Sequence, residues 1–307
     1  MKYLLLLAAY AVSAGIVWAQ AAPPPYVPEG KTMKVSEHVW VIPDGRVNLV
    51  PNIGFIVGSK ATLVVDSGMG DRNGRAVLRE LQRVSRNTDL YLTTTHFHPE
   101  HVTGFHVFPA SAKLIRPAIQ QQELPAKGPG MIANFSRMSP AHAELLNGAV
   151  MRPADIVFDS SVEIDLGGVT VRLFTLGPAH TKGDNFVRVK EDNVLFGGDV
   201  ITNRFFPILP DADSNGQHWI SILDQLAALR PRTIVPGHGE VDTIDIIARE
   251  RGILQALQLR ARKLKSEGLS AEDAAKVLSE EFRARYSEYE GPGMLGNGVK
   301  KFYAEAP

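Results

Sequence analysis

The stretch "TTTHFHPEH", residues 93–101, places three histidines and one glutamate within six residues. His96 and His98 are two residues apart, so an extended backbone points both imidazoles to the same side. His101 follows one helical turn after His98, so a short helical bend brings it near them. Buried imidazoles each need a polar partner, so core packing alone does not explain such a cluster. The stretch therefore predicts a metal site and constrains the fold to build one.

Composition limits what can hold the metal and what the protein can bind. The 307-residue chain has no cysteine, which excludes disulfides, thiolate ligands and cysteine nucleophiles and leaves His, Asp and Glu as ligands. Lys plus Arg and Asp plus Glu both total 33, so the formal net charge is zero. Nucleic-acid-binding proteins normally carry a basic excess, so we expect a small-molecule substrate and no nucleic acid. The sequence does not decide the oligomeric state.

The N-terminal segment has the pattern of a secretory signal peptide. An apolar run over residues 3–19 follows a single lysine and ends in Ala19-Gln20-Ala21, a small-x-small cleavage pattern. This predicts a signal peptide over 1–21, a proline-rich linker over 22–31, and a periplasmic or secreted protein without stable membrane association after cleavage. An uncleaved membrane anchor is the alternative, because the apolar run is near the lower length limit for a membrane-spanning helix, about 17 residues.

The rest of the chain alternates between strand and helix patterns. Strands are predicted at 38–43, 52–68 (a hairpin), 89–95, 114–115, 155–159, 169–177, 185–193, 194–200 and 232–239. Helices are predicted at 74–86, 117–124, 140–147, 216–230, 243–265 and 270–286, with a loop at 127–131. The halves that begin near 32 and 155 share one order of elements, which suits two packed sheets with helices outside. We expect one domain over 32–265 and a helical tail over 266–307.

Four predicted strands end in a loop that carries a metal-capable residue. The opening motif follows the first, and "GPAH", "GGD" and "PGHG" follow the others, giving His180, Asp199 and His238. Five imidazoles and two carboxylates are too many for one tetrahedral ion but suit two ions that share a carboxylate and keep a position for water. The remaining histidines are assigned ordinary structural or solvated roles: His38, His106, His142 and His218.

These motifs resemble those of the metallo-β-lactamase-fold hydrolases. Their HxHxDH motif is similar to His96, His98, Glu100 and His101, and the later motifs follow in order through residue 242: His180 in "AHTKGD", Asp199 in "GGD" and His238 in "VPGHG". An early "VVDSG" adds Asp66. The resemblance implies an α/β fold, an αββα sandwich with the site at the sheet edges, here with additional C-terminal helices.

The resemblance also implies two zinc ions and a role for each ligand. One ion takes His96, His98 and His180, the other takes Glu100, His101 and His238, with Asp199 between them. Asp66 orients a ligand or its loop. A hydroxide between the ions then attacks a carbonyl carbon, so we expect an exported zinc hydrolase of an amide, ester, lactone, thioester or β-lactam, with Glu100 and Asp199 at the catalytic centre.

Glu100 departs from the family motif, which has the shorter aspartate there. A glutamate carboxylate reaches further and is less fixed, which leaves three interpretations. The second ion shifts slightly and binds normally, or it binds weakly beside one tight ion, or Glu100 binds no metal and acts as a base or a supporting group. We favour the first, because His101 and His238 remain to hold that ion.

The substrate is less constrained than the site. Family β-lactamases carry cysteine or serine where this chain has Asp199, yet export suits a β-lactamase proper, which stays an alternative. One iron bound by the same ligand types, in a sulfur-oxidising enzyme, is another, and a metal-stabilised binding or scaffold protein is a third. Candidate substrate contacts lie near the ligand loops, with ordinary loop packing as the alternative: Lys182, Asn203 and Arg204, beside Phe205 and Phe206.

Overall fold

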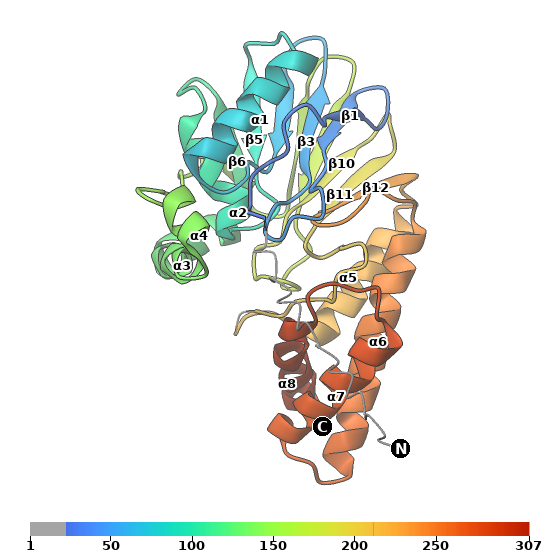
Figure 1. Cartoon of the computed structure of the whole chain (residues 1–307). Coiled ribbons are helices and arrows are strands. Elements are labelled where there is room, and N and C mark those ends of the chain that lie inside the picture. The colour runs from blue at the N-terminus through green and yellow to red at the C-terminus, as the bar shows by residue number, and fades with distance from the viewer. Residues whose placement is uncertain (1–22, 211, 307) are drawn as a thin grey trace, which may run out of the picture.

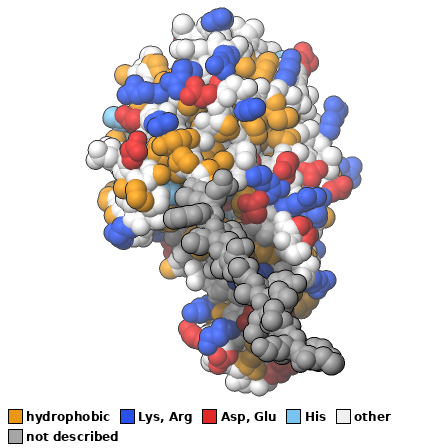
Figure 2. All heavy atoms as spheres, viewed as in Figure 1, with side chains coloured by type: hydrophobic (Ala, Val, Ile, Leu, Met, Phe, Trp, Pro, Cys, Tyr) orange, Lys and Arg blue, Asp and Glu red, His pale blue; other side chains and the backbone are white. Residues whose placement is uncertain are grey.

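The computed structural model describes residues 23–210 and 212–306, so the predicted signal peptide lies outside the described residues. Two sheets face each other in the middle of the molecule and helices cover their outer faces, as Figure 1 shows. The expected αββα sandwich with additional C-terminal helices is therefore confirmed. On the face drawn in Figure 2, Lys and Arg side chains lie interspersed with Asp and Glu.

The first sheet has seven strands in sequential order. They are β1 (Met33–Lys34), β2 (Val39–Ile42), β3 (Ile53–Val57), β4 (Thr62–Val65), β5 (Leu90–Thr93), β6 (Lys113–Pro117) and β7 (Ile156–Phe158). Strands β1 to β4 pair antiparallel, whereas β4 to β7 run parallel. The carboxyl ends of β4 and β5 therefore meet at one edge, where the loops that follow them lie side by side.

The second sheet has five strands in the order β12-β11-β10-β9-β8. They are β8 (Ser161–Asp165), β9 (Thr170–Phe174), β10 (Phe186–Val189), β11 (Val194–Gly198) and β12 (Thr233–Pro236). Pairing is antiparallel except between β11 and β12, which run parallel and end at the same edge. Strand β8 was not predicted, and it is an edge strand whose side chains are mostly exposed or half-buried.

Branched aliphatic residues from both sheets form the core between them. Val41, Ile56 and Val65 come from the first sheet, and Val171 and Val187 come from the second. Strand β3 contributes Gly54 at the contact with Phe196, where a Cβ on the glycine would lie 2.2 Å from the phenylalanine ring. The missing side chain therefore sets how closely the two sheets approach.

The outer face of the first sheet is covered by α1 (Gly70–Val84), whose Val77 and Leu81 pack on Val64 and Leu92. The metal motif opens the short helix α2 (Pro99–Val102), which continues into the 3₁₀ helix η1 (Thr103–Val107). Helices α3 (Ala118–Ser136) and α4 (Pro140–Leu145) follow on the same side, as Figure 1 shows.

The loop predicted at 127–131 is wrong, because helix α3 runs through these residues. The helix contains two prolines, Pro125 and Pro129. A proline removes one helical hydrogen bond and usually bends or ends a helix. Within this helix Lys127 Nζ lies 2.8 Å from Glu123 Oε1, one turn earlier, and 2.7 Å from Asp213 Oδ2 on a distant loop. Only the first of these contacts is local in the sequence.

Four helices form a bundle that shares one hydrophobic cluster with the second sheet and, as Figure 1 shows, extends beyond the sandwich. They are α5 (Gly216–Ala228), α6 (Asp245–Ser266), α7 (Ala271–Arg285) and α8 (Leu295–Glu305), with the 3₁₀ helix η2 (Pro292–Met294) before α8. The capping pattern predicted for α7 is present, since the Asp273 amide donates to Ser270 Oγ over 3.1 Å. Helix α8 was not predicted, and it packs Phe302 in one cluster with Trp219 and Leu257. The boundary predicted at 265 stays a prediction.

Among the described helices, none is both long enough and apolar enough to cross a lipid bilayer.

Gly54 gives a test of the sandwich packing. Gly54→Ala places a methyl group into the Phe196 ring, so we expect unfolding free energy to fall by about 1–3 kcal/mol through overpacking. The matched control is Gly252→Ala on α6, where a Cβ meets nothing within 4 Å and helix propensity predicts a gain of about 0.5–1 kcal/mol. Urea denaturation of the three proteins measures both changes. Equal stabilities for the two variants would contradict the packing described.

Candidate metal centre

Loops from both sheets meet at one edge of the sandwich and bring the predicted ligands together. His96, His98 and His101 follow β5, and Glu100 lies on α2. The loop after β9 carries His180, the end of β11 leads into Asp199, and the end of β12 leads into His238. All seven side chains are buried. A Cβ on Gly237 would lie 2.0 Å from Asp199 Oδ1, so only glycine lets these last two loops touch.

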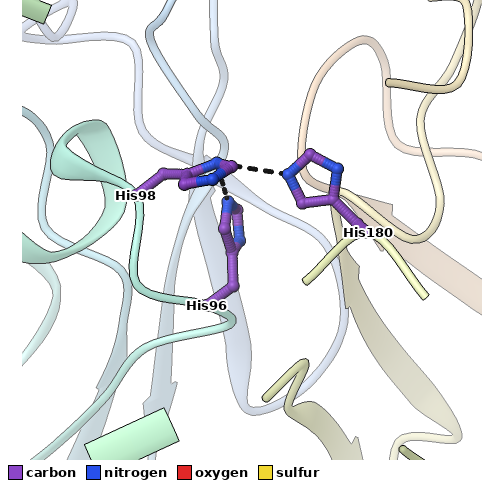
Figure 3. A group of neighbouring side chains, drawn as sticks. All are labelled: His96, His98 and His180. Atoms are coloured by element: carbon purple, nitrogen blue, oxygen red, sulfur yellow. Dashed lines mark hydrogen bonds between the residues drawn. The ribbon is translucent and has the colours of Figure 1, made fainter. Parts of the chain in front are cut away.

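His96, His98 and His180 form the first cluster. His98 Nδ1 lies 3.0 Å from His96 Nε2 and 3.2 Å from His180 Nε2, and Figure 3 shows the three rings pointing toward one another. The Ile208 carbonyl can only accept a hydrogen bond, so His180 Nδ1 donates to it over 2.7 Å. In the neutral imidazole this leaves a lone pair on Nε2, directed at the cluster.

Glu100, His101 and His238 form the second cluster, with one ligand atom of each lying within 4.8 Å of the others. His238 Nδ1 donates to the Val50 carbonyl over 3.0 Å. His101 Nδ1 lies 2.9 Å from Asp66 Oδ2. Both imidazoles therefore turn Nε2 toward the cluster, the orientation that a metal-binding histidine needs.

Asp199 lies between the two clusters. Its Oδ2 is 3.7 Å from His180 Nε2, 3.6 Å from His238 Nε2 and 3.9 Å from His96 Nε2, and its Oδ1 is 3.6 Å from His101 Nε2. No other described carboxylate approaches four imidazoles in this way. The geometry suits a carboxylate shared between two cations and supports the bridging role that the resemblance implies.

Asp66 fixes the loop that carries the first three histidines. It follows β4 in the left-handed region at φ 63°, and it accepts the Thr95 amide at 2.7 Å and the Thr95 hydroxyl at 2.8 Å. The same carboxylate accepts from His101, as described above. Asp66 therefore positions both the backbone and one imidazole, which supports its predicted orienting role.

Several buried polar residues that hold the other loops were not predicted. Asn52 Nδ2 donates to the carbonyls of Pro236 (3.0 Å) and Gly239 (2.7 Å) on either side of His238. Asp184 accepts the amide and hydroxyl of Thr181, next to His180. Asp184 carried a weak signal, since a carboxylate three residues after threonine often closes a turn. No sequence pattern indicated the role of Asn52, because its hydrogen-bond partners lie far along the chain.

Burial and neighbouring charge prepare these groups for cation binding. Burial lowers the pKa values of His96 and His98 well below the usual range for histidine, so both imidazoles are neutral and can offer a nitrogen lone pair to a metal ion. Burial raises the pKa of Asp199, but the surrounding imidazoles outweigh it and bring that pKa to about 2. Burial raises the pKa of Glu100 to about 7. At His101 burial opposes protonation, yet Asp66 and Asp199 raise the pKa to about 9, so a metal ion competes with a proton there.

The donor set fits zinc or a similar divalent ion. Buried atoms at the centre lack a hydrogen-bond partner among the described residues: Glu100 Oε2, His101 Nε2 and Asp199 Oδ1. Buried polar atoms are normally satisfied, and these three point to a bound cation. Imidazole nitrogen and carboxylate oxygen are zinc ligands, and the candidate groups provide three donors on each side of Asp199.

A cavity of about 240 Å³ adjoins the centre and is lined by five of the candidate ligands. Phe205 and Phe206 line it, as the sequence suggested. Lys182, Asn203 and Arg204 are not among its described lining residues. Asn203 instead holds the His238 loop, because its backbone N–H donates to the His238 carbonyl over 2.8 Å. Lys182 and Arg204 are exposed, so the substrate contacts predicted for all three stay predictions.

The remaining histidines have partners outside the centre. His38 Nδ1 lies 2.7 Å from Asp192, and His106 Nδ1 lies 3.2 Å from Asp71. His142 contacts Ser139 within its own helix turn, and His218 donates to the Pro178 carbonyl. These contacts support the structural or solvated roles expected for them.

Comparison with known proteins gives a family match and two curated relatives. The family model "Metallo-beta-lactamase superfamily" matches residues 46–238, more than half of the chain. A metallo-beta-lactamase type 2 from Bacteroides fragilis is 29% identical over 100 residues, covering 32% of this chain and 40% of that protein. A linear primary-alkylsulfatase from Pseudomonas sp. (strain ATCC 19151) is 20% identical over 291 residues, covering 81% of this chain and 54% of that protein. The chain thus spans about half the length of these relatives.

Solved structures show the same fold. A metallo-beta-lactamase from Pontibacter korlensis superposes with a TM-score of 0.59 at 16% identity, covering 73% of this chain and 98% of that one. The stereoselective inverting sec-alkylsulfatase from Pseudomonas sp. superposes with a TM-score of 0.66 at 15% identity, covering 89% of this chain and 50% of that one. The second match reaches further along this chain than the first.

The contact between Asp66 and His101 leads to a prediction about metal affinity. Asp66→Asn removes the charge that orients His101 and the Thr95 backbone, so we expect zinc to bind about 10–100-fold more weakly at one of two sites. Titration against a chromophoric chelator measures the affinity. Asp71→Asn is the matched control, because Asp71 is half exposed on α1 and its ion pairs among the described residues are with His106 and Arg75. Identical titrations of the two variants would rule out the role assigned to Asp66.

Proposed function

Because the chain belongs to the metallo-β-lactamase superfamily, whose members are generally hydrolases, we propose that it is an exported binuclear zinc hydrolase. Its substrate has a carbonyl group, as in an amide, ester, lactone or β-lactam. One observation carries the proposal: the Asp199 carboxylate lies between two clusters, within 3.9 Å of four imidazole nitrogens. Two triads that share a carboxylate are the arrangement for a pair of cations that acts on one substrate.

His96, His98 and His180 would hold one ion, and Glu100, His101 and His238 the other, with Asp199 shared. When bound, zinc supplies a nucleophile from water at neutral pH and polarises the bond to be cleaved. The chain's own contribution is to fix the ligands before the substrate arrives. Asp66, Val50 and Ile208 each hold an imidazole through Nδ1, so the site needs little reorganisation.

Glu100 takes a ligand's place in this proposal. Its longer side chain still reaches the cluster of His101 and His238, and its Oε2 has no hydrogen-bond partner among the described residues. This favours the interpretation in which the second ion shifts slightly and binds normally.

A sulfate ester is the second candidate substrate. The similarity to the two alkylsulfatases extends over 81% and 89% of this chain, further than the lactamase matches reported above. These proteins are about twice as long as the matched region, so the activity in their names is a proposal for this chain. A neutral ester and an alkyl sulfate both present an oxygen ester to the same centre, and a direct assay separates them.

Export rests on the N-terminal pattern of residues 1–21, which lie outside the described part of the chain. The proposed location is the periplasm or the exterior. The proposed partner is a small molecule, which fits the cavity beside the centre. A mononuclear iron enzyme uses the same ligand types, and export suits a β-lactamase proper, so both are tested as outcomes of the assay below.

The assay compares the purified protein as isolated, after chelation, and after addition of zinc or iron. Its panel contains p-nitrophenyl esters, lactones, β-lactams, alkyl sulfates and a persulfide. We expect ester or lactone hydrolysis that a chelator abolishes and zinc restores, because the nucleophile depends on the ions. Hydrolysis that survives chelation, or persulfide oxidation restored by iron alone, would overturn the proposal. Preference for β-lactams or alkyl sulfates would change the proposed substrate class, and the proposal that the protein is a zinc hydrolase would stand.

Variants of Glu100 test its place in the centre. Glu100→Asp restores the family residue, so we expect it to keep two ions and activity within about tenfold. Glu100→Gln keeps the size and loses the charge, so activity should fall by at least about 100-fold as the second ion is lost. Glu144→Gln, on the exposed face of α4, is the control. Full activity and two ions in Glu100→Gln would show that Glu100 holds no metal.

A further inference from the structure

Resting on the proposed hydrolase, we propose that the substrate carries an uncharged apolar chain that lies in the cavity beside the metal centre. We also infer that the C-terminal segment Gly291–Met294 is part of the wall that selects this chain. The cavity is lined by His98, Glu100, His180, Asp199 and His238 on one side, so whatever fills it touches the candidate ligands.

The rest of the lining is almost entirely apolar. It consists of Leu49, Met131, Phe135, Met138, Phe205, Phe206, Ile208, Pro210 and Met294, with Gly291, Asn48 and Thr202. Asn48 is exposed, and the Thr202 hydroxyl already contacts the Phe205 carbonyl and Glu250. No lysine or arginine is among the described lining residues. A charged group held away from the centre would lose its hydration without gaining a partner, so an uncharged chain is favoured.

Methionine marks the wall of the cavity. Three of the chain's seven methionines line it: Met131, Met138 and Met294. Methionine is unbranched and flexible, so it adapts to flexible apolar ligands more readily than branched residues do. Met138 is 54% exposed and Met294 is 37% exposed, although both are large and apolar. Exposed apolar side chains gathered at a cavity indicate a binding surface.

The C-terminal segment is fastened to the loop that follows Asp199. The Phe206 amide donates to the Glu290 carbonyl over 2.9 Å, and the Glu290 amide donates to the Arg204 carbonyl over 2.8 Å. The Glu290 side chain also pairs with Arg46 at 2.9 Å. Gly291 then turns the backbone at φ 74° into η2. Met294 is therefore held beside Phe205 and Phe206, which makes the helical bundle part of the substrate site.

The first test measures kcat/KM of the zinc-loaded protein for p-nitrophenyl acetate, butyrate, hexanoate and octanoate. Burial of each added methylene at about 0.8 kcal/mol predicts a rise of about fourfold per methylene until the cavity is filled. Met294→Glu places a charge in the wall, so the ratio of octanoate to acetate kcat/KM should fall by at least about tenfold. Met33→Glu, at an exposed methionine on β1, is the matched control.

The second test measures binding and does not depend on hydrolysis. Calorimetry should show octanamide binding at least about tenfold more tightly than butanamide or an octanamide that ends in an ammonium group. Met294→Glu should abolish this preference. Met294→Ala, which only shortens the side chain, should weaken octanamide binding and serves if the glutamate variant does not fold.

The outcomes separate the two proposals. Ester hydrolysis with no chain-length preference, or Met294→Glu behaving as Met33→Glu, would overturn the apolar-chain inference and leave the hydrolase standing. Octanamide binding that Met294 variants weaken, with no hydrolysis of any ester, would uphold the cavity and defeat the carbonyl hydrolase. Equal affinity for octanamide and butanamide would reject the inference whether or not the protein is a hydrolase.

Discussion

The approach of four imidazoles to one buried carboxylate is the constraint on which the rest of this structure depends. The imidazoles around Asp199 bring its pKa to about 2, and His101, whose own pKa is raised to about 9, lies 3.6 Å from it, whereas burial opposes protonation of His96 and His98. A buried charge of this kind persists only when it is paired or bound to metal. The loops, their glycines and their buried polar contacts all serve to bring Asp199 and the imidazoles to this point.

Strand direction explains how loops so distant in sequence meet. The parallel pairs β4–β5 and β11–β12 each end at the same edge, so Asp66 adjoins the histidine motif and Asp199 adjoins His238. The inter-sheet core then sets the distance between the two halves of the centre. The C-terminal bundle completes the arrangement, since its segment before α8 supplies one wall of the adjoining cavity. Stability of the fold and assembly of the site therefore rest on the same contacts.

The histidine motif could be predicted because its signal is local: His96, His98 and His101 are close in the chain and chemically specific. The other three ligand loops carry one ligand each and were assigned from their places at strand ends and from the order of the family motifs. Most strands, with β1 and β8 as exceptions, and most helices followed from hydrophobic periodicity in the same way. What sequence missed depends on contacts made across the chain. Helix α3 continues through two prolines and pairs its Lys127 with the distant Asp213, and the backbone amide of Asn203 holds a loop where a substrate contact was expected. Met294 belongs to the cavity only because Glu290 bridges to the loop after Asp199.

The central claim is that two metal ions bind on either side of Asp199. Crystallography of the purified protein with diffraction data collected on both sides of the zinc absorption edge tests it most directly. The account predicts two anomalous peaks, one among His96, His98 and His180 and one among Glu100, His101 and His238, both within bonding distance of Asp199. A single peak, a peak at the iron edge instead, or peaks away from Asp199 would contradict it.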